Sequence, residues 1–178
     1  MARSSTAQIA VKPQDLYVLF ALLTRQNGAP TYAQLGAQTG MSPSAVHASM
    51  KRVTAAGLAI HRDGKPAVLK PQLREFVFGG AKYVFPAMHG RIGKGVPTSY
   101  AAPALSGVIA PTSDPVPVWA HKSGSVRGVS LAPLYPTVPV AALRDANLYA
   151  VLSLFDAYRS GQARERAAAQ KLLDKYFQ

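Results

Sequence analysis

The sequence predicts a mainly α protein with a small β component, an α+β fold. Apolar residues recur at helical spacing towards both ends of the chain, within residues 13–56 and 144–178. Between these parts, Asp63-Gly64 indicates a β-hairpin, and eight of the 14 prolines fall between Pro97 and Pro139, where they exclude long regular elements. We therefore expect a flexible tail at 1–12, a helical unit with a hairpin at 13–85, an irregular Pro/Gly-rich segment with a small hairpin at 86–143, and a helical hairpin at 144–178.

The first expected helix lies in QDLYVLFALLTRQNG, residues 14–28, and is apolar on two sides. One side follows the i, i+3, i+4, i+7 spacing with Leu16, Leu19, Phe20 and Leu23. The second side holds Val18, Ala21 and Leu22. A helix that is apolar on two sides is usually buried on both, in a core or in a subunit interface.

Two short helices follow, each with a clear start signal. Thr31 with Gln34 three residues later forms a capping-box pattern, and this helix is expected to end near Gly40. Ser42-Pro43 supplies a capping hydroxyl and a proline at the first helical position, so the next helix should span 43–56 and end at Gly57. The hairpin expected at 59–68 comes directly afterwards. Three helices followed by a basic hairpin have the layout of a winged helix-turn-helix domain.

The helix expected at 43–56 has two different faces. Val46, Met50 and Val53 share one side, within about 60° at 100° per residue. Ser44, His47, Ala48 and Lys51 occupy the opposite arc. A helix that enters the major groove of DNA needs small or polar residues on its outer face, although a merely solvated surface helix has the same pattern.

The stretch YAQLGAQTGMSPSAVHASMKRVTAAGLAI resembles the helix-turn-helix of bacterial winged-helix regulators of the MarR-like kind, a resemblance that covers residues 13–70. The matching features are a small residue in the first helix (Ala37), glycine in the turn (Gly40), Ser-x-Ser at the start of the recognition helix, Val46, and Gly57-Leu58 before the wing. The resemblance implies a transcriptional regulator that binds duplex DNA. Its recognition helix would be 43–56 and its wing the basic hairpin. The candidate DNA-binding residues are Thr31, Ser42, Ser44, His47, Lys51, Arg52, Arg62 and Lys65. Arg52 has a second interpretation, since it could instead pair with Asp63 or Glu75.

The charge distribution favours a polyanionic partner. The formal net charge is +12, and residues 1–100 hold 12 Lys/Arg against three Asp/Glu. Residues 51–94 continue this basic run, including Lys70, Arg74, Lys82, Arg91 and Lys94. We expect a homodimer, because winged-helix proteins commonly bind two half-sites and the first helix has surplus apolar surface. The alternative is an antitoxin- or adaptor-like interaction module whose C-terminal half binds a partner protein.

Catalytic and cofactor sites find little support in the sequence. The four histidines lack metal-ligand spacing, cysteine is absent, and the carboxylates are scattered, so we expect a protein that is not an enzyme and holds no metal or cofactor. GRIGKGVP (90–97) lacks the Gly-Lys-Ser/Thr ending of a phosphate loop and is expected to be a flexible turn. The N-terminal residues lack the apolar core of a signal peptide and no stretch is long enough to span a membrane, so a cytoplasmic protein without membrane association is expected.

Three further elements are expected in the rest of the chain. A helix over 71–87 should break at Gly79-Gly80. PVWAH and SVRGVSL should pair as a hairpin around Lys122-Ser123-Gly124. The last two helices, before and after Gly161, should pack as an antiparallel pair.

Overall fold

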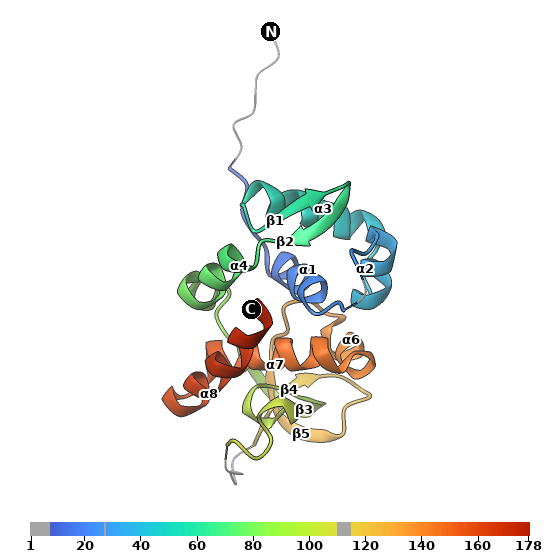
Figure 1. The fold of residues 1–178 in the computed structure, drawn as a ribbon. Helices are drawn as coiled ribbons and strands as arrows, with labels where there is room; N and C mark the ends of the chain where they lie inside the picture. The colour runs from blue at the N-terminus through green and yellow to red at the C-terminus, as the bar shows by residue number, and fades with distance from the viewer. Residues whose placement is uncertain (1–7, 27, 110–114) are drawn as a thin grey trace.

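The computed structural model describes residues 8–26, 28–109 and 115–178 and shows a mixed α/β protein (Figure 1). The predicted fold class is therefore confirmed at the level of helices with small sheets. Residues 8–12 of the predicted tail form no helix or strand, and the rest of that tail lies outside the described residues. None of the helices in the described ranges has both the length and the apolar character of a membrane span.

The N-terminal elements follow their local start and stop signals. They are α1 (Pro13–Leu23), α2 (Tyr32–Thr39), α3 (Pro43–Ala55), β1 (Ala59–Arg62) and β2 (Lys65–Val68). The capping box of Thr31 and Gln34 is formed, and Ser42 caps α3 through the backbone N–H of Ala45. Asp63 and Gly64 both have positive φ, 52° and 73°, as a two-residue hairpin turn requires. These predictions are confirmed.

The helix predicted to break at Gly79-Gly80 does not break there. The chain continues from α4 (Lys70–Phe76) through a π-helical turn (Val77–Ala81) into α5 (Lys82–Val84). Val77 and Ala81 are fully buried on this turn, and the Phe78 ring packs edge-on against Tyr158 and Phe177. Tertiary packing thus outweighs the weak helix propensity of the two glycines.

The segment expected to be irregular contains a small closed sheet. Its strands are β3 (His89–Pro97), β4 (Pro117–Ala120) and β5 (Val126–Leu131). The hairpin predicted between β4 and β5 is wrong, because these strands are parallel to each other and each pairs antiparallel with β3. GRIGKGVP therefore forms most of a strand and not a flexible turn. Its glycines permit close packing, since a Cβ on Gly95 would lie 2.4 Å from the Trp119 carbonyl oxygen.

The C-terminal part is helical, as predicted, with one helix more than expected. After α6 (Val138–Arg144), which falls in the segment predicted to be irregular, come α7 (Ala146–Ser160), α8 (Ala163–Asp174) and a short 3₁₀ turn (Lys175–Phe177). Two further 3₁₀ turns, Ser99–Ala101 and Pro103–Leu105, follow β3. Residues 151–158 of α7 are all buried, which makes α7 a central helix of the molecule.

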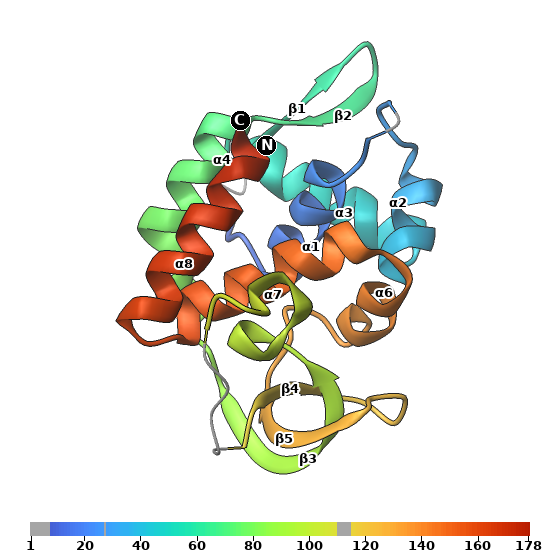
Figure 2. The ribbon, with the colours of Figure 1, turned by 60° about the horizontal axis from the view of Figure 1, so that its bottom comes forward.

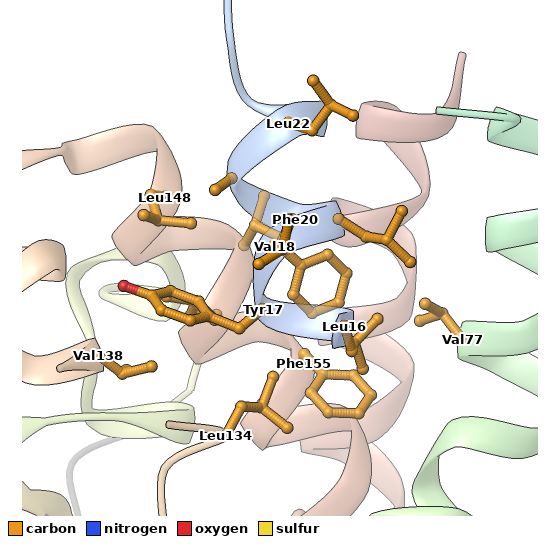
Figure 3. Packing of buried hydrophobic residues seen from close by; sticks show 14 of the residues in the cluster. Leu16, Tyr17, Val18, Phe20, Leu22, Val77, Leu134, Val138, Leu148 and Phe155 are labelled. Carbon is orange, nitrogen blue, oxygen red and sulfur yellow. The ribbon is translucent and has the colours of Figure 1, made fainter. Parts of the chain in front are cut away.

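Helix α1 lies between α3 and α7, and its apolar sides are both covered within the chain (Figures 1 and 3). Residues from Leu16 to Ala21 have no exposed surface, and Phe20 packs edge-on against Phe155 with ring centroids 5.5 Å apart. Helix α7 packs on the chain's own α1 and, through Tyr158, on the segment that follows α4, and α8 packs on α7. The apolar surface that led us to expect a dimer is thus accounted for inside one chain.

The sheet is fastened to α7 through the buried carboxylate of Asp156. This carboxylate accepts hydrogen bonds from Thr98 Oγ1 and Trp119 Nε1, both at 2.7 Å, and pairs with Arg159 at 2.8 Å. Arg159 also donates to the backbone carbonyls of Phe85 and Ala132. The two sheets stand at opposite ends of the molecule, with α1 and α7 between them (Figures 1 and 2).

Candidate nucleic-acid interface

The outer face of α3 is polar and open to solvent. Ser42, Ser44, His47, Ala48 and Lys51 are all exposed, as predicted from the helical spacing. The opposite face is fully buried and contains Val46, Ser49, Met50 and Val53. Only small or polar groups therefore project from the outer side of α3.

A tight turn sets the angle between α2 and α3. Gly40 adopts a left-handed conformation with φ of 69°. A Cβ on Gly36 would lie only 2.7 Å from the backbone carbonyl oxygen of Met41, so the chain can cross α2 closely only at a glycine. The small residue named by the family resemblance, Ala37, is exposed; the close approach occurs at its neighbour Gly36.

The end of α2 is also tied to the rest of the core. The backbone carbonyl of Thr39 accepts hydrogen bonds from Tyr17 Oη at 2.9 Å and from Thr137 Oγ1 at 2.5 Å. Tyr17 belongs to α1, and Thr137 directly precedes α6. The start of α3 is therefore positioned by elements from both halves of the chain.

Arg52 does not belong to the open face. Its guanidinium pairs with neither Asp63 nor Glu75 but with the fully buried Asp15 of α1. Arg52 Nη2 also lies 3.2 Å from Ser49 Oγ, and only 19% of the Arg52 side chain is exposed. Hydrogen bonding to Asp15 raises the pKa of Arg52 further above its ordinary value. Both proposed ion-pair partners were wrong, and Arg52 fixes α3 to α1.

A cluster of three rings joins α2, α3 and β1. The Tyr32 ring lies 5.3 Å from the His47 ring and 6.4 Å from the His61 ring, and Tyr32 Oη is 2.7 Å from His61 Nε2. Of these three residues, only His47 is among the predicted DNA-binding residues. The only signal was the recurrence of polar aromatic residues in three neighbouring elements, and their contact depends on the fold.

The hairpin places two cations at its tip, and His61 on its first strand is linked through Tyr32 to His47 on the outer face of α3. Arg62 and Lys65 are exposed cross-strand partners that flank the turn. In the described part of the chain, Lys51, Arg62 and Lys65 form no ion pair. Thr31 is also exposed, and its hydroxyl oxygen accepts the Gln34 N–H at the start of α2. The structure thus brings all of the predicted site residues except Arg52 to exposed positions on α2, α3 and the hairpin.

Part of the predicted basic run is engaged elsewhere. Arg74 pairs with Asp174 at 2.5 Å, and Lys70 donates to the backbone carbonyl of Gln178. The ammonium group of Lys82 lies over the rings of Tyr83 and Tyr158, at 4.8 and 5.5 Å. These cations hold the C-terminal helices and are not part of the open face of α3.

Within the described ranges, no group of three or more His, Asp or Glu residues is arranged to hold a metal ion. The buried carboxylates of Asp15 and Asp156 are both saturated by hydrogen bonds from arginine and other donors. Comparison of the chain with protein-family models, curated proteins and solved structures finds no match, so the geometry alone supports a function.

Proposed function

We propose that this chain is a winged-helix DNA-binding protein that acts as a transcriptional regulator, with α3 as its recognition helix and β1–β2 as its wing. The observation that carries the proposal is the combination of a small, polar outer face on α3 with the unpaired cations of the adjacent hairpin. Tyr32 connects both elements, because it contacts His47 on α3 and His61 on β1.

Helix α3 suits the major groove because its outer face carries only small or polar side chains. The groove is about 12 Å wide, so it admits a helix whose outer residues are small. Ser44 and His47 carry groups that hydrogen-bond to base edges, and Lys51 adds a cation for phosphate. Since this face has few strong base-reading side chains, most of its affinity would come from phosphates.

In this proposal the wing and the N-terminal ends of α2 and α3 contact the sugar-phosphate backbone of the DNA. Arg62 and Lys65 would neutralise phosphates beside the groove. Thr31 and Ser42 stand at the N-terminal ends of α2 and α3, where backbone N–H groups and the helix dipole favour an anion. Both hydroxyls cap their helices, so their contribution is chiefly to fix those N–H groups.

Salt-dependent binding to a fluorescent duplex tests the proposal. We expect wild-type affinity to fall steeply with salt, and the variant Lys51→Glu/Arg62→Glu/Lys65→Glu to lose at least about tenfold in affinity and most of the salt slope, which is about 0.9 per phosphate contact. The matched control is Arg164→Glu/Lys171→Glu/Lys175→Glu, which makes the same charge change at exposed cations on and after α8. Equal binding by the two variants would contradict the proposal.

Homodimerisation remains a prediction of the family resemblance. Light scattering of the free chain and of its DNA complex would show it as twice the mass of the 18.9 kDa chain. A complex with one chain per site would contradict it. A genome-wide binding map would then show whether the bound sites are promoters, as a regulator requires.

A further inference from the structure

The sheet of β3, β4 and β5 lies at the end of the molecule away from α3 (Figure 2), and it carries a second group of unpaired cations. Lys94 on β3 and Arg127 on β5 are direct cross-strand partners, and both are exposed. Arg91, also exposed, is a further cation on β3 and lies where the pairing with β5 is irregular, between His89 and Ile92. Like charges directly opposite each other on a sheet are unfavourable unless an anion lies between them. We call Lys94 and Arg127 the basic sheet face.

The other side of the same strands is closed by close packing. A Cβ on Gly95 would lie 2.4 Å from the Trp119 carbonyl oxygen, and one on Gly128 would lie 2.0 Å from the Val116 carbonyl oxygen. Side chains alternate along a strand, so Lys94 and Arg127 must point away from these glycines. Both cations are thus held on the outer side by the packing of the sheet.

The described residues provide no carboxylate to balance the basic sheet face. Between Glu75 and Asp145 the sequence contains a single acidic residue, Asp114, which lies outside the described residues. Glu165 lines a small cavity with His89 and Val129, where its carboxylate accepts the Gln162 N–H and caps α8. Among the described residues, none of Arg91, Lys94 and Arg127 enters an ion pair.

An open strand edge and an exposed apolar residue adjoin these cations. β5 occupies one edge of β3, but β4 pairs with the other edge only from Gly95 to Pro97. Within the described residues, the stretch 90–93 therefore has no strand on that second edge. Ile92, in the middle of this stretch, is 53% exposed and lies on the same side as Lys94.

We propose that the basic sheet face binds an acidic, extended segment of a partner protein, which adds a strand to the open edge of β3. Backbone hydrogen bonds to residues 90–93 would supply affinity, and carboxylates on the segment would meet Lys94 and Arg127. A second copy of this chain is a poor occupant, because pairing two β3 edges would bring their Arg91 and Lys94 residues together. Nucleic acid is also less suited, since an exposed Ile92 offers no stacking ring to bases.

The proposal does not rest on DNA binding by α3, and one pair of variants separates the two. The probe is a fluorescein-labelled peptide of about eight alternating Glu and Val residues, long enough for a strand. We expect it to bind the full chain, and Lys94→Glu/Arg127→Glu to weaken it at least about tenfold. Arg62→Glu/Lys65→Glu, with the same charge change on the wing, should leave peptide binding intact. Duplex DNA binding should instead weaken in Arg62→Glu/Lys65→Glu and stay intact in Lys94→Glu/Arg127→Glu.

Two further measurements keep the test specific to strand pairing. Bound peptide should protect the amides of residues 90–93 from hydrogen exchange, and N-methylation of alternate peptide residues should abolish binding. The proposal is overturned if the peptide does not bind, if both variants weaken it equally, or if protection falls outside residues 90–93. It is also overturned if a single-stranded or duplex oligonucleotide, and not the peptide, loses affinity in Lys94→Glu/Arg127→Glu.

Discussion

The guanidinium of Arg52 on α3 forms two hydrogen bonds with the carboxylate of Asp15 on α1, at 2.7 and 2.5 Å. Asp15 also accepts the backbone N–H of Lys12 at the start of α1, at 2.9 Å. The pair therefore joins the beginning of the first helix to the last turn of the recognition helix in our proposal. Arg52 is thus a cation on α3 that holds the fold together and lies outside the DNA-facing surface of our proposal.

Removing the charge of Asp15 should destabilise the protein. Asp15→Asn leaves a largely buried guanidinium with a neutral partner, and we expect the free energy of unfolding to fall by about 2–4 kcal/mol in urea titrations. Asp174→Asn is the matched control, because its pair with Arg74 is exposed and should contribute little. Similar losses in both variants would contradict a special role for the buried pair.

Arg52 and Lys51 are adjacent in sequence but should differ in their effect on DNA binding. Arg52→Gln should lower the midpoint of thermal unfolding and leave the salt slope of DNA binding unchanged at a temperature where the variant is folded. Lys51→Gln should leave the midpoint of thermal unfolding unchanged and reduce the salt slope of DNA binding by about 0.9. A reduced slope in Arg52→Gln would show that its guanidinium contacts phosphate after all.

Loss of the Tyr32 hydroxyl should loosen the hairpin. Tyr32→Phe keeps the ring beside His47 and removes the contact with His61 Nε2, so β1 and β2 should exchange amide hydrogens faster. We expect DNA affinity to fall a few-fold, with a stability loss of only about 0.5–1.5 kcal/mol. Unchanged exchange in the hairpin would mean that the hydroxyl does not hold it.

Gly36 should tolerate no side chain. In Gly36→Ala the new methyl group would meet the Met41 carbonyl 2.7 Å away, and we expect a loss of about 1–3 kcal/mol in the free energy of unfolding. Gly79→Ala is the matched control: no atom lies within 4 Å of a Cβ there, and alanine favours the helix, so stability should stay equal or rise. Equal losses would show that the α2–α3 crossing is not tight.

Alkaline pH should destabilise the fold through buried tyrosines. Burial raises the pKa of Tyr149 to about 12, and burial likewise raises the pKa of Tyr17 above its usual value of 10.0. A tyrosine that ionises less readily in the folded than in the unfolded chain stabilises the fold below pH 10 and loses that effect as the pH rises towards the folded pKa. Urea titrations across this range should show falling stability, with a shallower fall in Tyr149→Phe. An equally steep fall in that variant would show that Tyr149 does not contribute to the loss of stability at alkaline pH.

Short-range signals in the sequence predicted much of the N-terminal fold. Capping pairs such as Thr31 with Gln34, and the Asp63-Gly64 turn, act within a few residues, so the structure follows them. The exposed arc of α3 follows from helical geometry alone. These features were sufficient to place Ser44, His47 and Lys51 on one open surface.

What the sequence could not predict depends on contacts between distant residues. The partner of Arg52 lies 37 positions away, and the His61 contact of Tyr32 spans 29 positions. Strand β3 has three glycines and little apolar alternation, and at Gly95 it packs against the backbone of Trp119 on β4, where a side chain would not fit. The π-helical turn at Gly79-Gly80 is likewise held by distant rings, those of Tyr158 on α7 and of Phe177 in the final 3₁₀ turn.

The contact between Phe20 and Phe155 also has a consequence during protein synthesis. Helix α1 emerges early, but the helix that covers it is among the last elements to be made. Until then its apolar sides lack their final cover, and exposed apolar surface of this kind promotes aggregation and chaperone binding. A shortened product that ends after the β1–β2 hairpin would leave the side of α1 that faces α7 uncovered. The N-terminal helices therefore reach their final packing only after α7 has been made.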